Sequence, residues 1–116
     1  KEITMKMNKL LCAVTMLFIS HLSFAQIEID GNNKKLTLDC KGQKVEVGGS
    51  GHVINLKGDC TKVEIMGTNN TISVNGLTSA ELAGEGNTLY YRKALSKNGK
   101  LPQIIEGNNN TIIKKQ

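Results

Sequence analysis

The sequence is poor in aromatic residues: its 116 residues include two Phe, two Tyr and no Trp. Both Phe residues lie within the first 25 positions, so Tyr90 and Tyr91 are the only aromatic residues in the rest of the chain. Proteins that bind single-stranded nucleic acid stack successive bases on aromatic rings, and this chain lacks a series of such rings. We therefore do not expect a nucleic-acid partner.

Groups that carry catalysis or bind metals are also scarce. After position 25 the chain has one histidine, His52, and two cysteines, Cys40 and Cys60. No His and Cys residues stand at the spacing of a metal site, and no serine stands beside a base that could activate it. The acidic residues are spread along the chain. The sequence therefore predicts no catalytic site, no metal site and no cofactor.

The N-terminal segment has the pattern of a secretory signal peptide. Basic residues precede an apolar run at positions 10–19, and small residues stand three and one positions before a cleavage site between Ala25 and Gln26. The run is shorter than the roughly 20 residues that a membrane-spanning helix needs. We expect residues 1–25 to be the signal peptide and residues 26–116 to be an exported domain, periplasmic or extracellular, without a membrane span after cleavage.

Removal of the signal peptide lowers the formal net charge from +5 to +3, because 12 basic and nine acidic residues remain. Cys12 lies in the apolar run, whereas Cys40 and Cys60 stay in the exported domain. Two cysteines in an exported chain favour a disulfide. Cys40 and Cys60 lie at different positions within two successive turns of the repeat that is described below. The sequence therefore leaves open whether their Cα atoms come within the limit of about 7 Å for a disulfide.

A glycine motif recurs along the exported domain and predicts its architecture. The copies start at Gly31 (GNNKKL), Gly49 (GSGHVI), Gly67 (GTNNTI), Gly84 (GEGNTL) and Gly107 (GNNNTI). They are 18, 18, 17 and 23 residues apart. A recurrence at such a period is typical of repeat proteins, in which each copy stacks on the one before it.

Short strands with an apolar–polar–apolar pattern recur at half the glycine step. The first six begin at positions 27, 36, 45, 54, 63 and 72, and weaker copies begin at 80, 89, 103 and 112. Such alternation is typical of half-buried strands. An 18-residue repeat places each strand beside its own copy one coil earlier. The sequence therefore predicts an all-β fold without helices, a parallel β-solenoid of about five 18-residue coils.

The turns have a second signature. Two residues after each repeat glycine, only residues that tolerate positive φ occur. We interpret these as structural turn residues: Asn33, Gly51, Asn69, Gly86 and Asn109. One position later, Asn residues can stack into an amide ladder, and we interpret His52 as a substitution in this series. The alternative interpretation is a polar strip that binds a ligand.

These features together resemble a known bacterial family. The exported start, the G-x-N-N-T-I copies at Gly67 and Gly107, the related copy at Gly84 and the two cysteines are similar to the family catalogued as domain of unknown function 3060. The resemblance covers residues 36–114. It implies a small exported β-solenoid with no established activity, and it adds no site residue.

The outward positions of the strands predict two faces of different charge. On one face the middle residues of alternate strands form an acidic row, Glu28, Glu46, Glu64 and Glu81, beside which Lys44 and Lys62 form a basic row. A carboxylate row could attract a divalent cation, and the alternative is a solvated face compensated by lysine. The other face is nearly neutral, with Thr37, Asn55, Ser73 and Tyr90.

One connection departs from the repeat. The segment from Arg92 to Pro102 has eleven residues, contains the single proline and has no acidic residue. Insertions in solenoids emerge as loops on one face and are often the binding element. The basic residues of this segment are Arg92, Lys93, Lys97 and Lys100. They predict contact with an anionic partner, such as an acidic glycan of the envelope. The alternative is a plain connecting loop.

Together these observations predict an exported, non-catalytic module. It would bind another envelope component or serve a structural role. The alternative is a hydrolase or lyase that acts on an anionic polysaccharide, as some larger β-helices do, and it depends on fold analogy alone.

Overall fold

The computed structural model describes residues 26–116, which form eight strands and no helix. The strands are β1 (Gln26–Ile29), β2 (Lys35–Asp39), β3 (Lys44–Val47), β4 (Val53–Thr68), β5 (Thr71–Glu85), β6 (Thr88–Ala94), β7 (Gln103–Ile105) and β8 (Thr111–Lys114). The predicted signal peptide, with Ala25 at its cleavage site, lies outside the described residues. Within the described part of the chain, no helix is long and apolar enough to cross a membrane.

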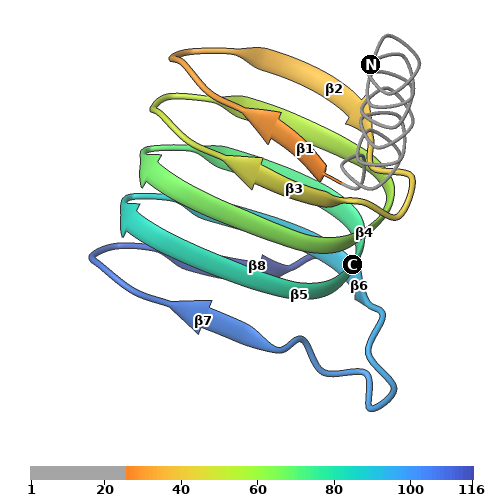
Figure 1. Ribbon diagram of the computed structural model, residues 1–116. Helices are drawn as coiled ribbons and strands as arrows, with labels where there is room; N and C mark the ends of the chain where they lie inside the picture. Colours follow the sequence, from red (N-terminus) through yellow and green to blue (C-terminus); the bar gives the residue numbers. More distant parts are fainter. Residues whose placement is uncertain (1–25) are drawn as a thin grey trace, which may run out of the picture.

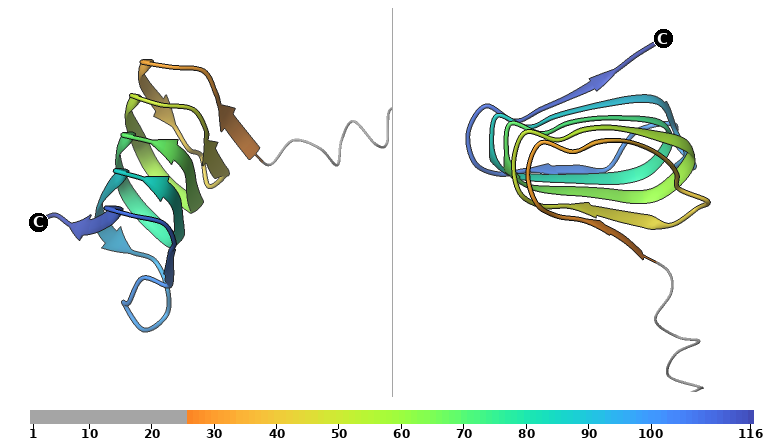
Figure 2. Two further views of the ribbon diagram at one scale, coloured as in Figure 1. Left: turned by 90° about the vertical axis from the view of Figure 1, so that its left-hand side faces the viewer. Right: turned by 90° about the horizontal axis from the view of Figure 1, so that it is seen from above.

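The chain winds into a parallel β-solenoid, as the repeat predicts (Figure 1). All strand pairs are parallel, and each strand lies on the strand one coil away (Figure 2). The first face contains β1, β3, the second halves of β4 and β5, and β7. The second face contains β2, the first halves of β4 and β5, β6 and β8. The path makes about four turns, so the expected number of about five coils is not confirmed.

The register of the strands follows the predicted period. Ile27 pairs with Val45, Val45 with Val63, and Val63 with Ala80. The step of 17 residues between two glycine motifs is absorbed by a register shift in β4, between Leu56 and Asp59. The shift lies in the bend of β4 that connects its second-face half to its first-face half, so both faces keep their inward and outward alternation.

Aliphatic side chains from both faces fill the interior. Val63 and Ile65 of the first face and Ile54 and Leu56 of the second are each at most 1% exposed. Full burial of such a side chain contributes about 1.5–3 kcal/mol, and ordering one residue of backbone costs about 1–2 kcal/mol. A single coil of 18 residues with about four inward side chains cannot fold alone, so stability depends on stacking.

The repeat glycines allow the turns of successive coils to touch. A Cβ atom on Gly67 would lie 2.0 Å from the backbone oxygen of Gly49, and Gly84 and Gly107 approach the preceding coil equally closely. Any side chain at these positions would collide with backbone, which cannot move aside. The motif therefore recurs because the stacking distance leaves no room for a Cβ atom.

Contact between turns also explains why Asn and Gly alternate two residues later. All five of these turn residues have positive φ, and Gly51 and Gly86 separate Asn33, Asn69 and Asn109. A Cβ atom on Gly51 would lie 2.1 Å from Oδ1 of Asn33, and one on Gly86 would lie 2.3 Å from Oδ1 of Asn69. The side chains of Asn33 and Asn69 therefore fill the space next to the turn of the following coil, and only glycine fits at the matching position of that turn.

A column of polar side chains is buried inside the turns. Its members are His52, Asn70 and Asn87, all fully buried, followed by the partly buried Asn110. The amides form a ladder: Nδ2 of Asn70 donates to Oδ1 of Asn87 at 3.1 Å, and Nδ2 of Asn87 donates to Oδ1 of Asn110 at 3.1 Å. No buried side-chain nitrogen or oxygen within residues 26–116 lacks a hydrogen-bond partner.

His52 takes the place of an asparagine in this column. Its Nε2 donates to the backbone oxygen of Gly48 at 2.8 Å, four residues back, just as Nδ2 of Asn87 donates to the oxygen of Ala83 at 3.0 Å. Its Nδ1 accepts the backbone N–H of Lys34 at 3.1 Å. Because a carbonyl only accepts, Nε2 carries the hydrogen. Both ring nitrogens are used within the turn, in agreement with a structural substitution.

The predicted disulfide between Cys40 and Cys60 is present. The Cα atoms are 5.3 Å apart, within the normal range, although the two residues occupy different places in successive turns. The two turns lie directly against each other: the backbone N–H of Cys40 donates to the oxygen of Lys57, and that of Gly42 donates to the oxygen of Asp59. The bond joins the turn between β2 and β3 to the corresponding bend of β4 in the next coil.

We expect Gly67→Ala to destabilise the fold far more than Gly99→Ala. Both glycines have positive φ, but a Cβ atom on Gly99 meets nothing within 4 Å. The φ penalty alone is about 1–2 kcal/mol, and the backbone collision at Gly67 adds about 1–3 kcal/mol. Urea denaturation of the oxidised protein measures both losses. Equal losses would show that the close approach of the turns is not required.

We also expect His52→Asn to retain most of the stability and His52→Leu to lose about 2–4 kcal/mol. Asparagine can accept from Lys34 and donate to Gly48, whereas leucine leaves both partly buried backbone groups without a partner, at about 1–2 kcal/mol each. The free energy of unfolding at pH 7 is the measurement. Similar stabilities of the two variants would contradict this role of His52.

Candidate functional site

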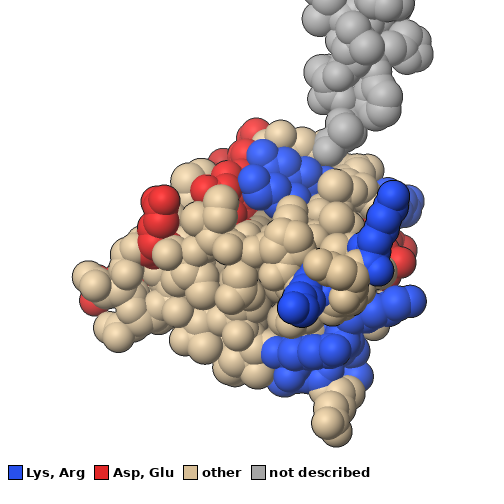
Figure 3. Space-filling view, turned by 90° about the horizontal axis from the view of Figure 1, so that it is seen from below, with Lys and Arg blue, Asp and Glu red and all other residues tan. Residues whose placement is uncertain are grey.

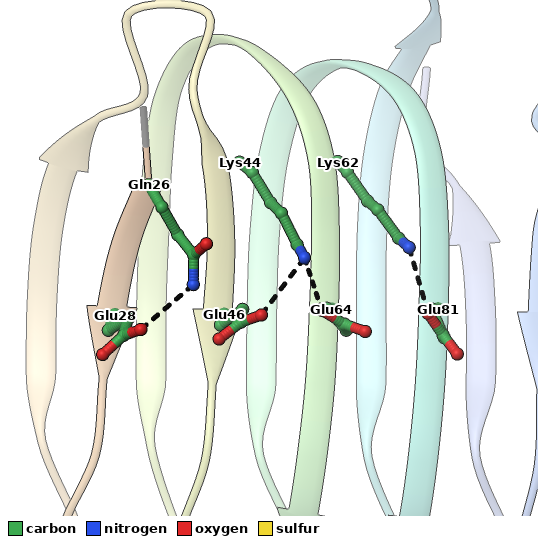
Figure 4. Close-up of polar contacts among 7 residues, drawn as sticks. All are labelled: Gln26, Glu28, Lys44, Glu46, Lys62, Glu64 and Glu81. Carbon is green, nitrogen blue, oxygen red and sulfur yellow. Dashed lines mark hydrogen bonds and ion pairs between the residues drawn. The ribbon is translucent and has the colours of Figure 1, made fainter. Parts of the chain in front are cut away.

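The acidic and basic rows of the first face lie in register, as predicted. Glu28 pairs with Glu46, Glu46 with Glu64, and Glu64 with Glu81, while Lys44 pairs with Lys62. Figure 4 shows the two lysines reaching along the sheet toward the carboxylates. Lys44 Nζ lies 3.1 Å from Glu46 and 3.0 Å from Glu64, and Lys62 Nζ lies 3.1 Å from Glu81. The cations of this face are therefore paired within the protein.

These ion pairs change the acidity of the groups that form them. The pKa of Lys44 is raised because its ammonium donates hydrogen bonds to Glu64 and, to a smaller extent, Glu46. The pKa of Glu64 is lowered from its ordinary value of 4.5, chiefly by the hydrogen bond from Lys44. Among residues 26–116, no three His, Cys, Asp or Glu side chains form a group that could hold a metal ion.

The predicted loop is shorter than the sequence indicated. β6 extends to Ala94 because Lys93 pairs with Gly76 and Ala94 pairs with Leu77 of β5. The segment that leaves the sheet is therefore 95–102, not 92–102. The backbone N–H of Leu95 donates to the oxygen of Leu77, and Leu101 packs against the aliphatic core. Leu95 and Leu101 therefore hold the two ends of the loop.

The tip of this loop is an ordered turn with exposed cations. Oδ1 of Asn98 accepts hydrogen bonds from the hydroxyl of Ser96 and the backbone N–H of Lys100, both at 3.0 Å. The four predicted contact residues, Arg92, Lys93, Lys97 and Lys100, are exposed, and none belongs to an ion pair within the described part of the chain. Seen from the C-terminal end, Lys and Arg gather on one side of the molecule (Figure 3).

The second face contains a hollow that the sequence did not reveal. It has a volume of about 310 Å³. It lies over the row formed by Asn55 of β4, Ser73 of β5 and Tyr90 of β6, which are directly paired neighbours. Asn55 and Ser73 are short, whereas Tyr90 is large, so the tyrosine forms a wall at the end of a low floor. The sequence analysis predicted only that this face is nearly neutral.

Three basic residues surround this hollow: Lys57, Arg92 and Lys115. Nζ of Lys115 lies 4.2 Å from the centre of the Tyr90 ring, a cation–π contact that holds the ammonium at the wall. Within the part of the chain that the structure describes, no acidic residue lines the hollow. Arg92 lines this hollow from β6, whose last residues lead directly into the loop 95–102, so the two features adjoin. We call them together the basic C-terminal surface: Lys57, Arg92, Lys93, Lys97, Lys100 and Lys115.

A second hollow of about 340 Å³ continues the first along the same face. The two share Asn55 and Ser73, and the second extends to Lys35 and Thr37 of β2 and Val53 of β4. Thr37 pairs with Asn55 on the next coil, and Asn55 pairs with Ser73 on the coil after that. The two hollows therefore form a shallow groove along the solenoid axis. Only the stacking of three coils creates it, so no single segment of sequence contains its signal.

The fold and this surface define a small parallel β-solenoid with a polar groove and a basic C-terminal end. Residues 47–104 match a family described as "Protein of unknown function (DUF3060)", and this range is half of the chain. The protein belongs to this family, which confirms the resemblance seen in the sequence. No curated protein and no solved structure matches the chain. The family description assigns no activity.

We expect Lys44→Gln to raise the pKa of Glu64 toward 4.5. Because the folded-state pKa of Glu64 is lowered, ionised Glu64 stabilises the fold above about pH 4.5, and this contribution is lost as the pH falls through the folded-state value. The variant should be less stable than the native protein at pH 7, and the difference should shrink in acid. Carboxyl-carbon NMR titration and urea denaturation at pH 7 and pH 3 test this. An unchanged Glu64 titration would contradict it.

Proposed function

We propose that this protein is an exported, non-catalytic module that binds an anionic component of the cell envelope through its basic C-terminal surface. The observation that carries the proposal is the different state of the cations on the two faces. Lys44 and Lys62 are paired with carboxylates of the protein, whereas the cations of the C-terminal surface belong to no ion pair among residues 26–116. Those cations are free to contact an external anion.

The disulfide supports the exported location in this proposal. A bond between Cys40 and Cys60 persists in an oxidising compartment and is rare in the cytosol. It agrees with the predicted signal peptide. The periplasm and the outside of the cell both provide such an environment, and both expose acidic glycans or phosphate-rich surfaces to an exported protein.

We prefer binding to the alternative of a hydrolase or lyase. Most glycoside hydrolases use a pair of carboxylates on either side of the scissile bond. Among residues 26–116, the groove is lined by amide, hydroxyl, aromatic, cationic and aliphatic side chains, without an Asp, Glu or His residue. This lining suits recognition of a charged ligand better than hydrolysis of it.

We expect the double variant Lys97→Gln/Lys100→Gln to bind more weakly to isolated envelope material and to an anionic resin at about 0.05 M salt. Two exposed cations at about 0.5 kcal/mol each correspond to about a fivefold loss of affinity. Folding should be unaffected, because both side chains are exposed and no core residue changes. Co-sedimentation with envelope fragments gives the affinity.

The matched control is Lys34→Gln/Lys41→Gln, which removes the same charge from exposed positions in the first coils. We expect this control to bind like the native protein. If both double variants lose affinity equally, net charge and not the C-terminal surface governs binding. If the native protein is not retained at all, the proposed function is wrong. Release of new reducing ends from an anionic glycan would support the enzymatic alternative.

A further inference from the structure

We propose that the groove on the second face is a binding site for an acidic polysaccharide, with one acidic sugar unit in the hollow beside Tyr90. This inference depends on the proposed function, because it names the ligand class and the place where that ligand binds. It assigns a role to Asn55, Ser73 and Tyr90, which the sequence analysis treated as part of a neutral face.

The floor of the hollow offers the groups that sugars require. The amides of Asn55 and Asn75 and the hydroxyl of Ser73 each provide both a donor and an acceptor. Sugar hydroxyls need such paired donors and acceptors, and the aliphatic residues of the same lining, Leu56 and Val74, suit the C–H groups of a sugar ring. The volume of about 310 Å³ is at the lower end for small-ligand sites, which suits one or two sugar units.

The rim of the hollow provides the charge for an acidic group. Lys57 follows Leu56 of β4 and Arg92 follows Tyr91 of β6, and both Leu56 and Tyr91 pair with Val74, so the two cations line the hollow from the strands on either side of β5 together with Asn75. Because β5 lies between β4 and β6, Lys57 and Arg92 approach the hollow from opposite sides. The arginine fork can donate two parallel hydrogen bonds to a carboxylate or phosphate group.

Tyr90 and Lys115 close one end of the site. The ring supplies an apolar surface for the C–H groups of a sugar, and the cation–π contact at 4.2 Å holds Lys115 in place before a ligand arrives. Tyr91 also lines the hollow but packs against the aliphatic core, and the described lining of the adjoining hollow contains no aromatic residue. This arrangement fits a sugar better than a nucleic acid, which stacks several bases in succession.

The shape of the groove points to a polymer. From the hollow beside Tyr90 the floor continues over Ser73 and Asn55 to Thr37, where Lys35 provides a further cation. The cations therefore lie at both ends of a polar floor that runs along the solenoid axis. A chain of acidic sugars could lie along this floor with its acidic groups against both ends.

The test uses protein expressed with its own N-terminal segment and purified after export. Titration calorimetry compares a tetramer of galacturonic acid, the neutral galactose tetramer and a sugar phosphate. We expect the uronate tetramer to bind and the neutral tetramer to bind at least tenfold more weakly. Stronger binding of the sugar phosphate would keep the acidic-sugar site but identify phosphate as its acid. Equal binding of the neutral tetramer would overturn the assignment of an acidic ligand.

Two variants locate the ligand in the groove. Ser73→Leu fills the floor without changing charge, and Arg92→Gln removes the fork from the rim. Each should weaken binding of the uronate tetramer at least tenfold, while Lys114→Gln, an exposed lysine that does not line either hollow, should change it less than twofold. Amide NMR spectra check that the variants stay folded.

The outcomes separate this inference from the function on which it depends. If Ser73→Leu and Arg92→Gln stay folded and bind the tetramer as well as the native protein, the groove is not the site. Retention on envelope material through Lys97 and Lys100 would then still support the proposed function. If Ser73→Leu unfolds, Asn55→Gln, which enlarges a floor side chain at an exposed position, provides the same test.

Discussion

The close contact between the turns of successive coils is the constraint on which the rest of this structure depends. The backbone oxygen of Gly49 lies where a Cβ atom of residue 67 would be, and the same contact recurs one coil later. With the turns held this closely, each strand lies directly on its copy and the hydrogen-bond ladders continue from coil to coil. A repeat that drifted by one residue would turn inward aliphatic side chains to solvent.

The buried polar column allows this close contact because it provides hydrogen-bond partners for backbone groups that the turns hide from water. Turns that pack so tightly hide backbone groups from water, and an unpaired buried group costs about 1–3 kcal/mol. Asn70 and Asn87 satisfy those groups by donating from one amide to a backbone carbonyl and to the next amide. His52 satisfies two backbone groups with a ring in place of an amide, because Nε2 donates to the oxygen of Gly48 and Nδ1 accepts the N–H of Lys34. The column therefore ties each turn to its neighbours on both sides.

The candidate site lies where the repeat breaks. The regular coils present short side chains or internally paired charges, as at Ser73 and in the Lys44–Glu64 pair. The last coils introduce a large aromatic residue, Tyr90, and the inserted segment 95–102 with its exposed lysines. A regular scaffold holds these exceptions rigidly, and a groove along the axis results because paired rows of side chains differ in size from coil to coil.

The fold class, the strand positions and the two charged rows could be predicted from the sequence, because an 18-residue repeat with period-two alternation permits few arrangements other than a parallel solenoid. The sequence also predicted that Cys40 and Cys60 pair. Tertiary structure alone decided that their Cα atoms lie 5.3 Å apart, why Asn and Gly alternate in the turns, and that β6 continues to Ala94. It alone brought Asn55, Ser73 and Tyr90 into one groove with Lys57 and Lys115, because these residues lie on different coils and become neighbours only when the coils stack.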